Sequence, residues 1–435
     1  MLLAIIWVAL HAHAVGYSFE DIRRMMNDGI SSALPAIYIF ILIGMVIASF
    51  MQSGTVASLI YYGLELLSPS LFLVVGLIMC SLMSVATGTS WGTAGTIGVV
   101  LMGIGAAMHI PLPLVAGMVV AGATFGDKLS PVSDTTNLAA MSAGTDLYRH
   151  IRSMLYTTVP TYVLSIMILG YLGLQYSGGH VPEQDITQVQ MALSGAFELN
   201  PLLTLSPLLV LLGMGVLRFS PEVTMITSIF TAVAVAILVQ DVSFVAAMNA
   251  LWNNSPGTTG DAKLDLMLGR GGMLSMAWTL FLSLMALAMG GILSTSGFLR
   301  VLLQRSISRL KSITALVAAT IASGIAGNLA MGEAYISIIL NCQLFNQAYE
   351  DQKLDKAVLS RSVEEGATLS TGLIPWTTAG AFYAVTLGVP TLEYAPYAFL
   401  NYLNPLVSVV IASLGWGLFR GTSRRGDFRA REMTD

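Results

Sequence analysis

Long stretches without a charged residue are the feature that most constrains the fold of this 435-residue chain. No Asp, Glu, Lys or Arg occurs between Glu65 and Asp127, a run of 61 residues (127 − 65 − 1). Uncharged runs occupy 29–64, 66–126, 153–182, 199–217, 223–240, 271–299, 312–332 and 394–419. About 20 apolar residues in a helix cross the roughly 30 Å hydrocarbon core of a bilayer. The runs therefore predict a helical protein that crosses a membrane many times.

The composition agrees with this prediction. Only 10% of the residues are charged and 55% are hydrophobic, whereas soluble domains carry about 25% charged residues. The weak alternation of apolar and polar residues that marks a membrane β-barrel is absent. We expect an all-α polytopic membrane protein with about 11–13 transmembrane helices, embedded in the lipid bilayer.

Several classes of function lack their sequence signals. None of the five lysines follows a glycine, so the chain has no Walker A loop for ATP. It has no nucleophile elbow, no HExxH motif and no Cys/His metal cluster. No basic, aromatic-rich stretch is suited to nucleic acid. We therefore expect a protein that is not an enzyme, requires no cofactor and binds no nucleic acid.

Loop charges predict the orientation, because cytoplasmic loops are enriched in Lys and Arg. The segment 177–200 and the loop 388–396 contain acidic residues but no Lys or Arg, and both are expected outside. Cations expected on the inside are Arg149, Arg152, Arg300, Arg305, Arg309, Lys311, Lys353, Lys356, Arg361 and the five arginines after 419. The predicted parts are an N-terminal transmembrane repeat (1–176), an extracytoplasmic loop (177–200), a C-terminal transmembrane half with an inverted repeat (201–419) and a cytoplasmic basic tail (420–435).

Three short patterns recur at a nearly constant spacing. Gly126–Ser130 and Gly366–Ser370 both read GxxLS and lie 240 positions apart (366 − 126). The pair Thr135-Thr136 has a counterpart in Thr377-Thr378, 242 positions later (377 − 135). The Gly-rich segment 88–93 corresponds to 328–333, again 240 positions later (328 − 88). Three matches in the same order predict an internal duplication.

The charges indicate that the two copies have opposite orientations. The first GxxLS segment runs from about Pro111 to Arg149, from outside to inside, and the second runs from about Lys353 to Glu393, from inside to outside. Inverted repeats with broken helices that meet near the middle of the membrane are typical of secondary transporters. Each half is expected to supply a re-entrant hairpin (around 86–98 and 325–337) and a broken helix (126–137 and 366–378).

The most polar stretch of the membrane region is Gly126–Asn137, which reads GDKLSPVSDTTN. A charged side chain at the centre of a membrane helix costs about 3 kcal/mol, so such residues are functional by default. Gly126 and Pro131 predict unwound backbone, whose free carbonyl groups could coordinate an ion.

These motifs resemble those of the NhaC-type sodium/proton antiporter family, within the wider ion transporter superfamily. The matching stretches are 86–93 (ATGTSWGT), 126–136 (GDKLSPVSDTT), 270–276 (RGGMLSM), 359–365 (LSRSVEE) and 374–378 (IPWTT). The resemblance implies exchange of sodium for protons across a prokaryotic cytoplasmic membrane, and some relatives are thought to couple organic anions. The chain departs from the family pattern at Trp376–Ala379, where Trp-Asn-Thr-Cys is expected, at Asn341–Gln343, where Pro-Gly-Arg is expected, and at Glu333, where Asp is common.

Sodium is a hard cation that prefers oxygen ligands, and the breaks offer many of them. The candidate ion ligands are Asp127, Ser130, Ser133, Asp134, Thr135, Thr136, Thr89, Ser90, Asn328, Glu333, Ser370, Thr371, Thr377 and Thr378. A carboxylate that binds either a sodium ion or a proton gives antiport by competition. We expect Asp134 to be the principal exchanging carboxylate and Asp127 the second. The candidate proton relay consists of Asp134, Glu333, Glu364 and Glu365.

Each candidate also has a structural alternative. Asp127 could pair with Lys128 or cap a half-helix, and Glu333 could be a helix N-terminal carboxylate. The hydroxyl groups could bond back to their own helices. Glu364 and Glu365 could lie near the inner interface with Arg361.

The sequence thus predicts a secondary transporter that exchanges sodium ions for protons by alternating access. The alternative is an organic-anion exchanger of the malate/lactate type, for which Lys128 is the candidate cationic group. The pattern is compatible with a homodimer. It does not determine stoichiometry or the choice among Na⁺, Li⁺ and K⁺.

Overall fold

The computed structural model describes residues 1–31, 34–176, 183–298, 301, 310 and 312–419, and these residues form helices and connecting turns without a β-strand. The predicted basic tail 420–435, residues 177–182 and the four cations Arg300, Arg305, Arg309 and Lys311 lie outside the described residues. The all-α prediction is confirmed. Within the described residues, seven segments are long and apolar enough to cross a membrane. They are α5 (Pro69–Thr87), α6–α7 (Ser90–Ala107), α8 (Leu112–Leu129), α10 (Leu147–Leu174), α14 (Pro221–Leu238), η2–α17 (Met273–Thr295) and α19 (Ile313–Met331).

Two bent pairs bring the number of candidate crossings in the described part of the chain to nine. Helix α3 (Leu34–Gln52) meets α4 (Thr55–Leu66) at 67°, and α23–η3 (Thr391–Tyr397) meets α24 (Phe399–Ser413) at 54°. This is fewer than the 11–13 predicted. Three further apolar helices, α1 (Leu2–Ala14), α13 (Ser206–Val216) and α22 (Thr378–Leu387), fall below the length of a full crossing.

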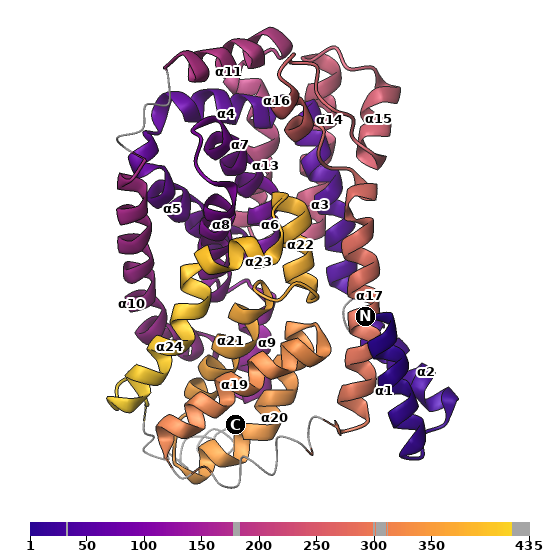
Figure 1. Ribbon diagram of the computed structural model, residues 1–435, viewed down its shortest axis with the longest axis vertical. Helices are drawn as coiled ribbons and strands as arrows, with labels where there is room; N and C mark the ends of the chain where they lie inside the picture. Colours follow the sequence, from indigo (N-terminus) through magenta and orange to yellow (C-terminus); the bar gives the residue numbers. More distant parts are fainter. Residues whose placement is uncertain (32–33, 177–182, 299–300, 302–309, 311, 420–435) are drawn as a thin grey trace, which may run out of the picture.

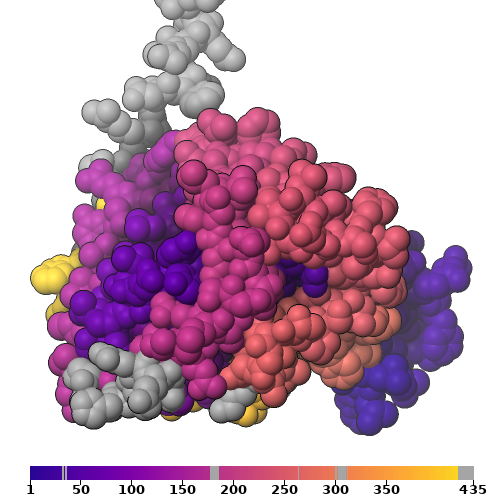
Figure 2. Space-filling model, turned by 90° about the horizontal axis from the view of Figure 1, so that it is seen from above, coloured from indigo at the N-terminus to yellow at the C-terminus, as the bar shows by residue number. Residues whose placement is uncertain are grey.

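The two ends of the molecule differ in the elements they carry. In Figure 1 the upper end holds α11 (Glu183–Ala196), α15 (Phe244–Trp252) and α16 (Ala262–Leu268), and the lower end holds α19, α20 (Ala334–Asp351) and the start of α10. Seen from the upper end, segments coloured magenta to salmon cover much of the bundle (Figure 2). The exposed cation Arg149 lies at the lower end, on the first turn of α10.

The helices break at the four positions that the sequence indicated. Helix α5 ends at Thr87, and Gly88 takes a left-handed φ of 70° that few other residues adopt cheaply. Helix α19 ends in the same way, with Gly332 at a φ of 71°. Helix α8 ends before Pro131, and α21 (Lys356–Thr371) ends before Pro375, since proline cannot continue the backbone hydrogen-bond ladder. Helices α9 (Asp134–Ala143) and α22 then begin beyond these breaks.

Matched glycines hold a helix pair together in each half. Gly126 of α8 packs so closely on α5 that a Cβ there would lie 2.4 Å from the Ser81 carbonyl oxygen. Gly366 of α21 packs on α19 so that a Cβ would lie 2.4 Å from the Ile321 carbonyl oxygen. Both residues of the second pair follow those of the first by 240 positions (321 − 81 and 366 − 126), so the displacement predicted from the GxxLS pattern recurs in the packing.

At the breaks themselves the displacement is 244. Gly332 matches Gly88 (332 − 88), and Thr377, which caps α22, matches Ser133 at the start of α9 (377 − 133). The sequence comparison assigned 240 and 242 here, because short Gly, Ser and Thr patterns align equally well in neighbouring registers. The opposite orientation of the two copies, and the re-entry of the hairpins, stay predictions.

Candidate functional site

One cavity lies where the four breaks come together. It has a volume of about 60 Å³, several times the roughly 10–15 Å³ that holds one water molecule. Its polar lining comes from every break and comprises Thr89, Ser90, Thr124, Asp127, Asp134, Thr135, Glu333, Tyr335, Thr368, Thr371, Thr378 and Tyr383. Both halves of the chain therefore contribute oxygen atoms to the same small space.

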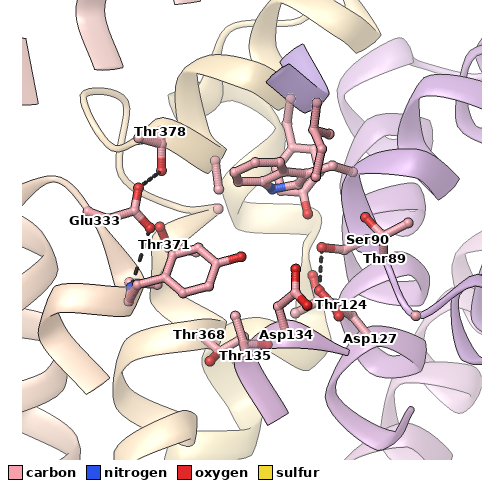
Figure 3. A pocket seen from close by; sticks show the side chains of 18 of the residues that line it. Thr89, Ser90, Thr124, Asp127, Asp134, Thr135, Glu333, Thr368, Thr371 and Thr378 are labelled. Atoms are coloured by element: carbon pink, nitrogen blue, oxygen red, sulfur yellow. Dashed lines mark hydrogen bonds between the residues drawn. The ribbon is translucent and has the colours of Figure 1, made fainter. Parts of the chain in front are cut away.

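Two carboxylates on opposite sides of the cavity are each held by a hydroxyl from another helix (Figure 3). Asp127, in the last turn of α8, accepts a hydrogen bond of 2.6 Å from the Ser90 hydroxyl. Glu333, at the start of α20, accepts one of 2.6 Å from Thr378 of α22 and another of 3.3 Å from the Tyr335 amide. The first of these bonds joins α8 to the break between α5 and α6, and the Thr378 bond joins α22 to the break between α19 and α20.

Asp134 differs from the other two carboxylates in its exposure. Asp127 is 9% exposed and Glu333 is 1% exposed, whereas Asp134 is open to solvent within the cavity. It is the first residue of α9, so its carboxylate lies at a helix N-terminus, where the peptide dipoles favour negative charge. Figure 3 shows Asp134 and Thr135 between the two bonded pairs.

The cavity is suited to a cation. Three carboxylates line it, and among the described lining residues none is Lys, Arg or His. In the part of the chain that the structure describes, no three His, Cys, Asp or Glu side chains converge closely enough to hold one metal ion. A bound cation would therefore be completed by hydroxyl and backbone oxygens, which broken membrane helices typically supply.

Six of the predicted ligands lie beside the cavity lining rather than in it, and most of these bond to backbone. Ser130 donates to the Val85 carbonyl (2.8 Å), and Ser370 donates to the Gly366 carbonyl (2.6 Å). Thr377 caps α22 by accepting from the Gly380 amide (3.1 Å). The amide nitrogen of Asn328 donates to the Ser370 hydroxyl (2.9 Å). Ser370 and Thr377 thus bond within their own helices, which is the structural alternative stated for the hydroxyl groups, whereas Ser130 and Asn328 bond to neighbouring helices, α5 and α21.

The other two, Ser133 and Thr136, lie at the start of α9. The Ser133 hydroxyl is 3.2 Å from that of Thr135, which lines the cavity. Thr136 lies 3.2 Å from the Asp127 carbonyl oxygen and 3.4 Å from Glu364 Oε1. Thr136 therefore connects the cavity wall to a second group of polar side chains.

This second group, the buried charge cluster, consists of Lys128, His150, Arg361, Glu364 and Glu365, all of them 0% exposed. Lys128 Nζ lies 3.8 Å from Glu365 Oε1, so Lys128 pairs with Glu365 rather than with its neighbour Asp127. His150 Nε2 lies 2.7 Å from Glu364 Oε2. Arg361 donates to the carbonyl groups of Ser153 and Gly417. The sequence placed Arg361 among the loop cations, but the helix α21 carries it into the interior.

Several cavity residues were missed by sequence reasoning. Tyr335 could have been found, since it lies two residues after Glu333. Thr124, Thr368 and Tyr383 lie inside regular helices, where no local pattern marks them. His150 has the same difficulty, because it is one polar residue in the polar first turn of α10.

A comparison with known families matches the model of the Na⁺/H⁺ antiporter family over residues 1–136 and 122–416. The chain is 39% identical to the Na⁺/H⁺ antiporter NhaC of Alkalihalophilus pseudofirmus, over 96% of this chain and 90% of the relative. It is 34% identical to the malate-2H⁺/Na⁺-lactate antiporter of Bacillus subtilis (92% and 86%). It is 32% identical to the arginine/ornithine antiporter ArcD of Halobacterium salinarum (93% and 84%).

Proposed function

Because the chain belongs to the Na⁺/H⁺ antiporter family, we propose that this multi-pass membrane protein exchanges sodium ions for protons at the cavity between its four helix breaks. The observation that carries the proposal is the charge of the cavity lining. Three carboxylates, Asp127, Asp134 and Glu333, line one small space, and no described lining residue is cationic.

Competition for the carboxylates couples the two ions. A sodium ion needs deprotonated oxygen ligands, so its binding displaces protons and weakens as the pH falls. Asp134 is the principal exchanging group in this proposal, because it is the carboxylate most open to the cavity. Asp127 and Glu333 are held by Ser90 and Thr378 on opposite sides of the cavity, and hydroxyl and backbone oxygens would complete the coordination of the ion.

Transport would follow an alternating-access cycle. The Ser90–Asp127 bond joins α6 to α8 in the first half of the chain, and the Thr378–Glu333 bond joins α22 to the start of α20 in the second half. Relative movement of the two halves would open the cavity to one side of the membrane and then to the other, as in transporters built from repeats. The proton gradient would drive sodium outward.

Exchange of an organic anion is the less favoured function for this chain. A carboxylate substrate needs a cationic partner, and Lys128 was the candidate. Lys128 points into the buried charge cluster, where Glu365 is its partner, and it does not line the cavity. The negatively charged lining favours a cation instead.

Proteoliposomes with an acidic interior and a quenched pH dye test the proposal. Added Na⁺ should dequench the dye, and K⁺ or choline should not. A response to malate or lactate without a response to Na⁺ would contradict sodium/proton exchange.

The charge of the cavity can be tested with paired variants. Asp134→Asn and Glu333→Gln should each lower the exchange rate by about 100-fold or more, within the range lost with one proton-transfer group. Asp241→Asn and Glu65→Gln are matched controls, because both side chains are exposed away from the cavity. Exchange by Asp134→Asn at the rate of Asp241→Asn would remove Asp134 from the mechanism.

A further inference from the structure

We propose that His150 is a proton-carrying residue of the exchange cycle, which takes up a proton beside Glu364 and thereby weakens sodium binding in the neighbouring cavity. This inference rests on the proposed sodium/proton exchange. It assigns to the buried charge cluster a role in coupling the two ions.

The geometry of His150 is that of a group placed to exchange protons. Both ring nitrogens contact side chains that can pass a proton: Nε2 lies 2.7 Å from Glu364 Oε2 and Nδ1 lies 2.7 Å from the Ser360 hydroxyl. The ring is 0% exposed. Among the described histidines, His11, His13 and His109 are exposed, and His150 is the one in the interior.

The contacts of His150 lead in two directions. On one side, Glu364 Oε1 lies 3.4 Å from the Thr136 hydroxyl, which lies 3.2 Å from the backbone oxygen of Asp127. On the other side, Ser360 belongs to the first turns of α21, which begins beside the partly exposed ion pair of Arg149 and Asp355. His150 therefore lies between the cavity and the end of the molecule that the loop charges place in the cytoplasm.

The charges around the ring determine what a proton there would do. Lys128 from α8 and Arg361 from α21 balance Glu364 and Glu365 from α21, so the cluster is neutral when His150 is neutral. Helix α9 contributes Asp134, which faces the cavity, and α10 carries Arg149 and Arg152 at its exposed start. Helices α5 and α24 also pack on α10 and contain no Asp, Glu, Lys, Arg or His.

Protonation therefore gives the buried cluster a net charge of +1. The step is the formation of one N–H bond on the imidazole as a proton arrives from the Ser360 side, and Glu364 holds the resulting cation. Charges interact strongly in a dry interior, so this cation disfavours Na⁺ beside Asp127. By linkage, a bound Na⁺ expels the proton. Histidine is suited to this task because its neutral ring has one nitrogen that donates and one that accepts, and both donate when the ring is protonated.

The test compares His150→Gln with His11→Gln, which alters an exposed histidine on α1. Sodium binding to each purified protein is followed from pH 6 to 9 by tryptophan fluorescence, because Trp91 lines the cavity. Exchange is measured in proteoliposomes over the same range. Glutamine keeps hydrogen-bonding groups but cannot carry the charge, so the pH dependence of sodium binding should flatten and exchange should fall by about tenfold or more.

The outcomes separate the two proposals. If the unaltered protein shows no Na⁺-driven proton movement, the proposed function fails. If it does, and His150→Gln keeps the same rate and pH profile, only the role of His150 fails. Should His150→Gln not fold, Ser360→Ala takes its place, since it removes the Nδ1 partner and otherwise only a bond of 3.2 Å to the Ala357 carbonyl within the same helix. An unchanged pH profile in Ser360→Ala would then overturn the inference.

Discussion

At the scale of single residues, the two halves of the chain supply complementary groups to the cavity. Thr89 and Glu333 are the N-caps that follow Gly88 and Gly332, with nearly the same φ of −143° and −145°. In this register the carboxylate of one half corresponds to a hydroxyl of the other. At the first residues of α9 and α22 the order is reversed: the carboxylate, Asp134, comes from the first half and the hydroxyl, Thr378, from the second. Negative charge therefore comes from both halves.

The bond between Thr378 and Glu333 gives a prediction about sodium affinity. A hydrogen bond to a charged group contributes about 1.5–3 kcal/mol, so Thr378→Val should raise the sodium concentration for half-maximal exchange by roughly tenfold or more. Thr378→Ser keeps the hydroxyl and should change that concentration little. The measurement is the sodium dependence of dye dequenching in proteoliposomes. Equal half-maximal concentrations for the valine and serine variants would show that the hydroxyl is not needed.

At the scale of helices, local breakers and close packing act together to form the cavity. Gly88, Pro131, Gly332 and Pro375 lie where helices end, and each break leaves backbone groups without helical partners. The pairs α5–α8 and α19–α21 then pack closely enough to hold the broken ends against one another. The glycines at these contacts leave no room for a side chain, because the nearest atom that each one meets is a backbone carbonyl oxygen.

The glycine contacts give a prediction about stability. Gly126→Ala and Gly366→Ala should each lower the thermal unfolding temperature, because the added methyl group would meet carbonyl oxygens at 2.4 Å. Overpacking of this kind costs about 1–3 kcal/mol or more. Gly213→Ala is the control, since a Cβ there meets nothing within 4 Å. The measurement is thermal unfolding in detergent, and an unchanged unfolding temperature for both variants would contradict the tight contact.

At the scale of the whole molecule, the cavity lies between groups of helices from the two halves of the chain, for which the loop charges predict opposite orientations. Asp351 lies at the end of α20, in the stretch expected inside, and Glu393 lies in the first turn of α23, expected outside. Both side chains are exposed. The two native cysteines are buried, so reagents that attack thiols meet little background.

Cysteine labelling in intact cells tests this orientation. A membrane-impermeant maleimide should label Glu393→Cys directly and Asp351→Cys only after the membrane is permeabilised. Labelling of both variants from the outside would contradict the inverted arrangement of the second half. It would leave the membership in the antiporter family unaffected.

The membrane fold, the positions of the four helix breaks and the family follow from the sequence alone, because each depends on local properties. Long uncharged runs require burial in lipid, Gly and Pro end helices wherever they lie, and GDKLSPVSDTT is a continuous motif. Eight of the predicted ligands, including Asp127, Asp134 and Glu333, line the cavity for the same reason: they lie at those breaks.

Only the tertiary structure decided which of these groups meet. Asp127 and Lys128 are neighbours in the chain, yet successive residues of a helix point about 100° apart, since a turn holds 3.6 residues. Asp127 therefore faces the cavity and Lys128 faces Glu365, which follows it by 237 positions (365 − 128). The pairing of His150 with Glu364 has the same origin. Such contacts depend on how whole helices pack, and no local pattern in the sequence records that packing.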